Sequence, residues 1–415
     1  MKILVVGSDL PATSSMPGSP RLFSLCRHLS REHRLTLAAV AQSAERQREF
    51  VADPMTAGVF DEVVVLPTPP AFGWLGAQRH RLRQAPYFIT QYRTPAFYAD
   101  QCRRIRDLYV GGGFDAIFVD GIWVAQYVEG ARLGCPAVVD LHDSITLLTV
   151  RTRDREKTWL GRQRLSSSVR SIGKIEARLN RTFGAVIVNS SVDEAFLRRL
   201  NPAANTLTIG NGVDADFFSP GDVEPDPSKI VFTGVMTYEP NEDAAIHFAD
   251  SIFPVIKARR PEMEFWIVGK DPGPRVRALA ERPGVHVTGS VPDVRPYARS
   301  AGVIVSPLRF GTGVKNKLLA ALSMRKPVVA SSPTIEGLAV VDGRDLLVAD
   351  DPADFAAKVI RLIEDPAYGR RLAESGQAFV RENYSWESSA RQLERALLDV
   401  VNRNGRPVAS RVGQP

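Results

Sequence analysis

The stretch Ser300-Ala-Gly-Val-Ile-Val-Ser-Pro-Leu-Arg-Phe-Gly-Thr-Gly-Val-Lys-Asn-Lys-Leu-Leu-Ala-Ala-Leu-Ser-Met-Arg-Lys-Pro-Val-Val-Ala330 decides the fold. It opens with the short apolar run Gly302–Ser306, which is typical of a strand, and continues into the glycine-rich loop Phe310–Gly313. Val314–Met324 then has the composition of a helix, and Pro327–Ala330 begins another strand. A strand, a loop, a helix and a further strand in this order predict part of a parallel sheet covered by helices.

The glycine-rich loop is also the first sign of chemistry. A loop that enters a helix leaves free N–H groups at the helix start, and such groups bind anions, most often phosphate. Lys315 and Lys317 stand in the first turn of the expected helix, where the helix dipole disfavours cations. A bound anion explains them economically. On this stretch alone, a surface loop with solvated lysines explains them equally well.

Short apolar runs alternate with helical stretches over the whole chain, which predicts parallel sheets covered on both faces. The expected strands are Lys2–Val6, Arg34–Val40, Glu62–Leu66, Ala116–Val119, Ala137–Asp140 and Ala185–Val188, then Lys229–Thr233, Glu264–Val268, Val285–Thr288, Gly302–Val305, Pro327–Ala330 and Leu346–Val348. The expected helices include Arg21–Arg31, Pro95–Val110, Ile122–Leu133, Ser171–Thr182, Glu242–Arg259, Val276–Arg282 and Pro352–Ile363.

The repeated scheme predicts an α/β protein with two Rossmann-like domains that face each other across a cleft. A proline-rich linker at Pro220–Lys229 puts the boundary between residues 218 and 219, so that the domains are 1–218 and 219–385. Residues 386–403 form a C-terminal helix that we expect to cross back to the first domain, and residues 404–415 form a frayed tail. Ligands bind at the carboxyl ends of parallel strands, so we expect the active site in the cleft.

Composition excludes several classes of protein. No apolar run approaches the length of a membrane span, and Met1–Val6 is expected to be a first strand and not a signal peptide. The three cysteines are scattered and the histidines number only six, so we expect reduced thiols, a cytoplasmic location, no metal and no cofactor.

The net charge of +7 is concentrated in one run. Arg151–Arg181 holds ten basic residues against three acidic ones. Such a run could meet the anionic inner face of a membrane or an anionic acceptor, or it could be a solvated helical face. Nucleic acid is not an expected partner, because no recognition module and little aromatic interleaving are present.

Three common motifs are absent or weak. The first strand is followed by Gly7-Ser-Asp-Leu-Pro11 and not by Gly-x-Gly-x-x-Gly, which argues against a nicotinamide-dependent oxidoreductase. No Gly-x-x-x-x-Gly-Lys-Ser/Thr loop occurs. Asp214-Ala-Asp216 resembles a metal-holding Asp-x-Asp, but it follows a turn and is interpreted as structural.

Six segments together resemble the GT-B retaining glycosyltransferases of family 4, most closely the bacterial sugar transferases associated with exopolysaccharide export. The resemblance covers nearly the whole chain. The segments are Ala137-Val-Val-Asp-Leu-His-Asp143, Ile187-Val-Asn-Ser-Ser191, Ile209-Gly-Asn-Gly-Val-Asp214, Phe232-Thr-Gly-Val-Met-Thr-Tyr-Glu-Pro-Asn241, Val285-His-Val-Thr-Gly-Ser-Val-Pro-Asp293 and the loop and helix quoted first.

The resemblance implies that the second domain holds a nucleotide-sugar, a UDP-sugar by default, and that the first presents a glycan, lipid-linked or small-molecule acceptor. It implies transfer with retention and without a metal, in polysaccharide biosynthesis. The residues it assigns to the donor are Gly234, Met236, Asn241, Val291, Gly313, Val314, Lys315 and Lys317. Glu336 is a further donor candidate as the nearest carboxylate in sequence, and the alternative is that it only caps a helix.

On the acceptor side, His142 and Asp143 follow a strand and are the candidate catalytic residues. A neutral imidazole there could bond a sugar hydroxyl or the acceptor; the alternative is a loop histidine held by Asp143. Asp9, Ser14 and Ser15 are the acceptor-binding candidates in the first loop. Glu176, within the basic run, is expected to form a structural ion pair.

The chain departs from the family pattern at three positions. Thr312 and Ala320 stand where family members commonly carry two glutamates, and Arg325 stands where a glycine is usual. Arg325 could reach a phosphate or simply be a helix-end cation. Two alternatives therefore remain open: a catalytically impaired GT-B protein that binds a nucleotide-sugar or a partner without turnover, and a nucleotide-sugar epimerase on the same scaffold.

Overall fold

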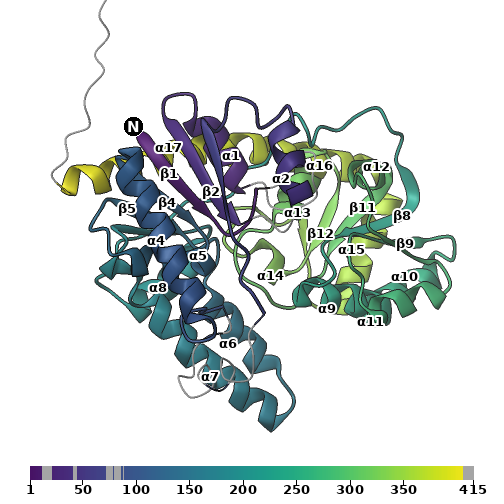
Figure 1. Cartoon of the computed structure of the whole chain (residues 1–415). Helices are drawn as coiled ribbons and strands as arrows, with labels where there is room; N and C mark the ends of the chain where they lie inside the picture. Colours follow the sequence, from purple (N-terminus) through teal and green to yellow (C-terminus); the bar gives the residue numbers. More distant parts are fainter. Residues whose placement is uncertain (12–20, 41–43, 72–77, 79–85, 87, 405–415) are drawn as a thin grey trace, which may run out of the picture. The chain divides into compact units, whose positions relative to one another are not determined.

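The computed structural model describes residues 1–11, 21–40, 44–71, 78, 86 and 88–404, and the chain divides into two compact units (Figure 1). Unit 1 holds the described residues of 1–210 together with 389–404, and unit 2 holds Asn211–Ser388. The boundary between residues 218 and 219 stays a prediction, as does the role given to each domain. Ser14 and Ser15 lie outside the described residues.

A seven-stranded parallel sheet forms the centre of unit 1 within the described part of the chain, in the order β3-β2-β1-β4-β5-β6-β7. The first strand explains why these residues form a sheet: Ile3 to Val6 are fully buried, as expected for a strand covered on both faces. The strands are β1 (Lys2–Gly7), β2 (Arg34–Val40), β3 (Glu62–Leu66), β4 (Ala116–Asp120), β5 (Ala137–Asp140), β6 (Ala185–Val188) and β7 (Thr206–Thr208).

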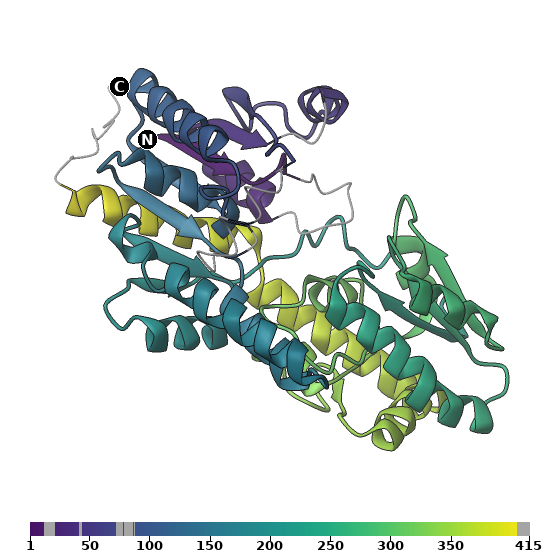
Figure 2. The same cartoon turned by 60° about the horizontal axis from the view of Figure 1, so that its bottom comes forward.

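Helices cover this sheet, and the two between β5 and β6 that are labelled α6 and α7 form a hairpin. The described helices of unit 1 are α1 (Arg21–Leu29), α2 (Ala44–Ala52), α4 (Pro95–Gly112), α5 (Ile122–Ala131), α6 (Ile145–Arg155), α7 (Trp159–Glu176) and α8 (Ser191–Leu200), with a 3-10 helix at Leu179–Arg181. The last helix, α17 (Trp386–Arg403), lies against unit 1 over most of its length (Figure 2). Ser389 Oγ donates to Gly210 O at 2.8 Å, and Glu394 Oε1 lies 2.8 Å from His33 Nε2.

Unit 2 is built on a six-stranded parallel sheet in the order β10-β9-β8-β11-β12-β13. Its strands are β8 (Asp226–Thr233), β9 (Glu264–Val268), β10 (Val285–Gly289), β11 (Ala301–Ser306), β12 (Val328–Ala330) and β13 (Leu347–Val348). Its helices are α9 (Glu239–His247), α10 (Phe253–Arg259), α11 (Pro274–Arg277), α12 (Arg295–Ser300), α13 (Asn316–Ser323), α14 (Ser332–Ile335), α15 (Pro352–Glu364) and α16 (Pro366–Asn383), with a π-helical turn at Phe248–Ile252 and a 3-10 helix at Ala278–Glu281.

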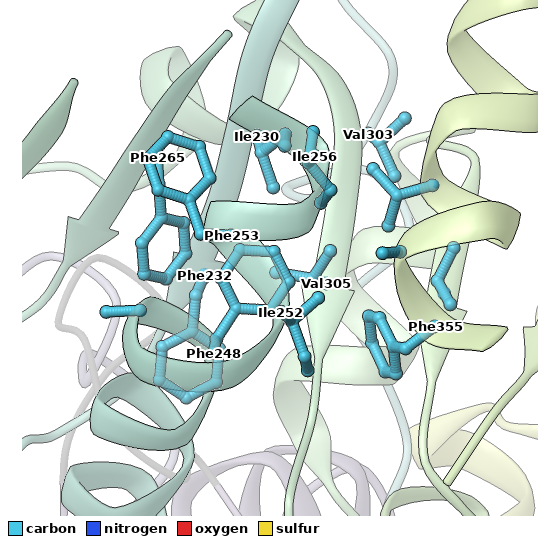
Figure 3. Packing of buried hydrophobic residues seen from close by; sticks show 14 of the residues in the cluster. Ile230, Phe232, Phe248, Ile252, Phe253, Ile256, Phe265, Val303, Val305 and Phe355 are labelled. Atoms are coloured by element: carbon cyan, nitrogen blue, oxygen red, sulfur yellow. The ribbon is translucent and has the colours of Figure 1, made fainter. Parts of the chain in front are cut away.

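Aromatic rings fill one side of this second sheet (Figure 3). The ring of Phe248 lies 4.4 Å from that of Phe265 on β9 and 6.0 Å from that of Phe355 on α15, centroid to centroid. A second cluster contains Leu318 and Leu322 of α13 together with residues of β8, β9 and β12. The burial of its apolar face fixes α13, and with it the loop that precedes it.

The structure confirms the α/β architecture and most of the expected strands. The third strand of each unit shows how closely the expected bounds agree with the observed ones. In unit 1, β3 has the expected bounds Glu62–Leu66. In unit 2, β10 extends one residue beyond the expected Val285–Thr288. Three helix predictions were wrong. The helix expected at Val276–Arg282 is divided between α11, which ends at Arg277, and the 3-10 helix at Ala278–Glu281. The helix expected at Ser171–Thr182 is α7, which begins at Trp159, and the single helix expected at Glu242–Arg259 is interrupted by the π-helical turn. Among the described helices, none is both long and apolar enough to cross a membrane.

Candidate functional site

The glycine-rich loop of unit 2 joins the end of β11 to the start of α13. β11 lies between β8 and β12 in the sheet, and the carboxyl ends of parallel strands meet at one edge. Gly313 adopts a φ of 68°, a conformation that residues with a side chain rarely take. The loop therefore owes its shape to this glycine, and its position to a central strand.

Lys317 points into this edge of unit 2. Its Nζ donates to Asn241 Oδ1 at 2.7 Å and lies 4.0 Å from the centre of the Phe232 ring. Burial, and next the positive charge of Lys315, lower the pKa of Lys317 well below its usual value. Among the described residues, this ammonium contacts a neutral oxygen and a ring face, and no carboxylate pairs with it. An anionic ligand would therefore raise its pKa.

Lys315 has a different role in the same loop. Its side chain is buried, and its Nζ donates to Thr312 O at 2.6 Å and to Gly313 O. These two hydrogen bonds tie the Lys315 side chain to the backbone of its own loop and hold the ammonium beside the start of α13. A phosphate contact from Nζ would require it to exchange or share these bonds.

Two glycines let the backbones at the ends of β8 and β9 approach each other closely. A Cβ atom at Gly269 would lie 1.7 Å from Gly234 O, and one at Gly234 would lie 2.8 Å from Asn241 Nδ2. Gly234 N donates to Val268 O at 3.0 Å, and Asn241 Nδ2 donates to Val235 O at 3.0 Å. The structure therefore brings the candidates Gly234, Asn241 and Lys317 together, while Gly269 was missed by the sequence analysis.

Three other donor candidates of unit 2 have buried or partly buried side chains. Met236 is 1% exposed in the aromatic core, and its backbone N–H donates to Lys270 O at 3.0 Å. Val314 is buried in the cluster around α13, against which Val291 packs. The side chains of Met236 and Val314 therefore belong to the core of unit 2, so a donor contact of these two residues would come from their backbone.

Glu336, the remaining donor candidate, directly follows α14 and is half-buried. Buried hydroxyl groups fasten this short helix to the ends of β11 and β12. Thr334 Oγ1 donates to Ser306 O at 2.7 Å, and Ser331 Oγ donates to Leu308 O at 2.5 Å. The sequence analysis missed this hydroxyl cluster, because nothing in the spacing of Ser306, Ser331 and Thr334 shows that they meet.

In unit 1, His142 lies just after β5 with a backbone φ of 64°. Its N–H donates to Asp140 Oδ1 at 3.0 Å, and its C=O accepts from Asn189 N at 2.7 Å. A left-handed residue with a side chain costs about 1–3 kcal/mol and persists only where its surroundings hold it. Such strain concentrates at functional positions, which favours a functional role for His142.

Carboxylates set the charge of this histidine. His142 Nε2 lies 2.7 Å from Asp120 Oδ1 at the end of β4. Burial alone would lower the pKa of His142, but Asp120 and Asp140 outweigh it and raise the pKa to about 9. The ring is therefore an imidazolium at neutral pH, so the expected neutral imidazole is wrong. The alternative in which Asp143 holds the ring is also wrong, because its partner is Asp120.

Arg21 completes this cluster from the start of α1. Its Nε donates to Asp140 Oδ2 at 2.7 Å, and both side chains are 1% exposed. Its Nη1 donates to Gly210 O at 3.2 Å. Arg21 and Asp120 were missed by the sequence analysis. Asp120 could have been found, because it ends a buried strand with the same Val-Asp pair as Val139-Asp140; Arg21 gave no such signal.

The other unit 1 candidates lie near strand ends. Asp9 follows β1, and its Oδ1 accepts from Leu10 N at 2.8 Å. Asp143 is half-buried beside His142, and its N–H donates to Leu141 O at 2.8 Å. Within the described ranges, no group of three or more His, Cys, Asp or Glu side chains is placed to hold a metal ion.

The interpretation of Glu176 needs correction, and Arg325 has the helix-end position of one of its two alternatives. Glu176 has no ion-pair partner among the described residues: it is buried, and it accepts from Ser144 Oγ at 2.8 Å and from Thr146 N at 3.3 Å. Burial raises its pKa to about 7, although these hydrogen bonds oppose the shift. Arg325 donates to Gln377 Oε1 at 3.0 Å, so its guanidinium serves the packing of α16. Its φ of 54° shows why glycine is usual at this position.

Asp214, by contrast, has the structural role that was expected. Its Oδ1 accepts from Phe217 N at 2.9 Å and closes a turn.

Two Rossmann-like units in one chain define the GT-B class of fold, and comparisons with known proteins agree with it. Residues 18–212 match the family described as "Glycosyl transferase 4-like domain", and residues 227–365 match "Glycosyl transferases group 1". The two matches together span most of the sequence. The chain belongs to the GT-B glycosyltransferases that these families describe.

Two curated relatives share part of the sequence. An uncharacterized glycosyltransferase of Methanocaldococcus jannaschii is 26% identical over 123 residues, which cover 29% of this chain and 31% of that protein. An uncharacterized 44.6 kDa protein in the cps region of Klebsiella pneumoniae is 23% identical over 164 residues, 38% of this chain and 42% of that protein. The chain thus matches less than half the length of these relatives.

Solved structures resemble the chain over nearly its whole length. Sucrose-phosphate synthase from Thermosynechococcus elongatus has a TM-score of 0.72 at 16% identity and covers 97% of this chain and 100% of its own. The Anabaena protein Alr3699/HepE, solved with UDP, has a TM-score of 0.65 at 16% identity, with 96% and 99% covered. At these identities the likeness shows the fold alone.

Proposed function

We propose that the chain transfers a sugar from a nucleoside-diphosphate donor, a UDP-sugar by default, to an acceptor hydroxyl with retention of configuration. The observation that carries the proposal is Lys317, a buried lysine beside a glycine-rich loop whose partners among the described residues are the neutral Asn241 amide and the Phe232 ring. A diphosphate would supply the missing negative charge. The Anabaena protein of the same fold was solved with UDP-glucose, which supports the choice of nucleotide.

In the proposed reaction, the acceptor oxygen attacks the anomeric carbon while the bond from that carbon to the β-phosphate oxygen breaks. The bonding electrons leave with the diphosphate, and the acceptor proton passes to an oxygen of the leaving phosphate. The backbone N–H groups around Gly313 and the ammonium of Lys317 stabilise the charge that develops there. In this scheme neither a metal ion nor a separate protein base is required.

His142 has a proposed part in the same reaction. As an imidazolium, it gives one N–H to Asp120 and retains Nδ1–H as a donor. We assign this second donor to an oxygen of the donor sugar or of the acceptor. Asp143 would position the loop, and Asp9, Ser14 and Ser15 would bind an acceptor that is a glycan, a lipid-linked sugar or a small molecule. We place the reaction in cytoplasmic polysaccharide biosynthesis.

Calorimetry of UDP binding tests the donor site. Lys317→Ala removes a charged hydrogen bond to phosphate and should weaken binding by about 2 kcal/mol. Lys257→Ala is the control, because Lys257 is another lysine of unit 2 whose Nζ donates hydrogen bonds within the unit, to Met263 O among others. Ala320→Glu, which restores a family carboxylate, should bind UDP equally or more tightly. Equal affinity in the wild type and Lys317→Ala would remove Lys317 from the site.

A second candidate, nucleotide-sugar binding without turnover, rests on the apolar or neutral side chains at Thr312 and Ala320. The experiment that distinguishes this candidate from sugar transfer is to incubate the protein with UDP-sugars and a panel of acceptors, and to measure free UDP and product. Transfer with retention, read from the anomeric proton signals of the product, supports the proposal. UDP binding without UDP release supports the second candidate, and a donor converted to its epimer supports an epimerase.

A further inference from the structure

The α6–α7 hairpin of unit 1 carries two exposed apolar side chains at its outer end. Trp159 and Leu160 begin α7 and are 70% and 63% exposed. At the other end of the same helix, Ile172 and Ile175 are buried in the core of unit 1. Figure 1 shows the hairpin reaching away from the sheet of its own unit. We call residues 155–164 the hairpin tip.

The hairpin tip is firmly built. Glu156 Oε1 accepts from both N and Oγ1 of Thr158, each at 2.8 Å, and Thr158 Oγ1 accepts from Gly161 N at 3.2 Å as the N-cap of α7. Arg162 Nε donates to Glu156 O at 2.6 Å. The apolar pair is thus held outward by an ordered turn, and ordered exposure of large apolar side chains marks an interaction surface.

The charge around the tip is positive and is only partly explained by helix stability. Residues 151–164 hold six basic and two acidic residues. Arg153 and Arg155 end α6, where the helix dipole favours cations. Lys157 and Arg162 lie at the start of α7, which has no acidic residue in its first turn and where cations are disfavoured. An anionic partner would offset this unfavourable placement.

We propose that the hairpin tip binds the surface of an anionic lipid bilayer. Trp159 and Leu160 would enter the boundary between headgroups and acyl chains, where tryptophan is favoured, and the surrounding basic side chains would meet anionic headgroups. A nucleic acid fits less well, because it offers Leu160 no apolar surface. The inference does not depend on sugar transfer, since membrane binding is measured without any donor or acceptor.

Co-sedimentation of the full chain with vesicles tests the proposal. Vesicles of phosphatidylcholine with 30% phosphatidylglycerol should bind the protein at low salt and lose it as salt rises, and vesicles of phosphatidylcholine alone should bind weakly. Replacing Trp159 and Leu160 together by Ala should weaken binding at least tenfold. Replacing Arg162 and Arg164 by Gln should weaken it about fivefold per charge removed.

Matched variants control for general loss of apolar surface or charge. Val110→Ala removes a 72% exposed side chain from α4, and Arg275→Gln with Arg277→Gln removes two exposed charges from α11; neither should change binding. Lipid that is brominated on its acyl chains should quench the tryptophan fluorescence of the wild type more than that of Trp159→Phe. Unchanged binding after loss of Trp159 and Leu160, or equal binding to both kinds of vesicle, would overturn the proposal. So would Trp159-dependent self-association without lipid, which would make the tip a protein interface.

Discussion

A cationic candidate residue lies near the strand ends of each unit, His142 in unit 1 and Lys317 in unit 2, and their surroundings shift the two pKa values in opposite directions. In unit 1, His142 lies against Asp120 and Asp140, and these carboxylates raise its pKa to about 9 despite burial. In unit 2, Lys317 donates to a neutral amide oxygen, and burial together with Lys315 lowers its pKa. Both residues lie near the carboxyl ends of parallel strands, where open α/β sheets bind their ligands.

The difference shows how burial and neighbouring charges together decide the charge of a cation: burial lowers the pKa of both side chains, and only His142 has carboxylates that reverse the shift. The unit 1 histidine is charged before any ligand arrives, because its counter-charge is part of the protein. The unit 2 lysine has no such counter-charge among the described residues, so an anionic ligand would supply it. The following experiments test each side of this contrast.

The largest expected effect concerns the backbone that supports the unit 2 lysine. Gly269→Ala would place a Cβ atom 1.7 Å from Gly234 O, so one of the two strand ends must move. We expect the free energy of unfolding to fall by about 3 kcal/mol. Gly273→Ala is the control, because its Cβ atom would meet its nearest neighbour at an ordinary 3.4 Å. Equal stability of both variants in urea denaturation would contradict the close approach.

Glu176 tests whether unit 1 also buries a charge without a counter-ion. Its pKa is about 7 in the folded chain against 4.5 ordinarily, so the folded state binds its proton more tightly. Stability from this group is present below pH 4.5 and decreases by about 3 kcal/mol as the pH rises to about 7. Glu176→Gln lacks this component. When the free energy of unfolding of both proteins is measured from pH 5 to pH 8, the stability of the variant should rise relative to that of the wild type. Parallel pH dependence of the two stabilities would disprove the raised pKa of Glu176.

His142 should show the smaller pH effect expected of a partly exposed ring. Its folded pKa of about 9 exceeds 6.5, so its stabilisation is complete below pH 6.5 and disappears as the pH rises through 9. With allowance for solvent screening, the stabilisation is about 1–2 kcal/mol. Asp120→Asn should return the pKa toward 6.5, which NMR titration of the imidazole protons measures. An unchanged pKa in that variant would mean that Asp120 does not set the charge.

The sequence predicted the strands better than the hairpin. Buried parallel strands are nearly continuous apolar runs, so Glu62–Leu66 and Glu264–Val268 have the expected bounds. The α6–α7 hairpin was missed because its basic and polar sequence hides the helical pattern, and only the caps at Ser144 and Thr158 mark its two helices. β7, at Thr206–Thr208, is too short to produce a pattern.

The candidate site could be predicted in part for the same reason. Gly234, Asn241 and Lys317 follow strands whose ends meet, so their proximity followed from the order of elements. The ionisation of His142 did not, because Asp120 belongs to another strand and its contact depends on tertiary packing. Pairings across the sheet and burial, which set pKa values, are properties of the folded chain.

The central claim is that unit 2 holds an amine ready for a diphosphate. If binding raises the lowered pKa of Lys317, UDP binding must take up protons at pH values between the pKa of the free protein and that of the complex, and affinity must fall as the pH rises through this range. Calorimetry in Tris and in HEPES at one pH measures this uptake, since the two buffers differ in ionisation enthalpy. We predict net proton uptake that Lys317→Met removes; the same enthalpy in both buffers, or proton release, would contradict the account.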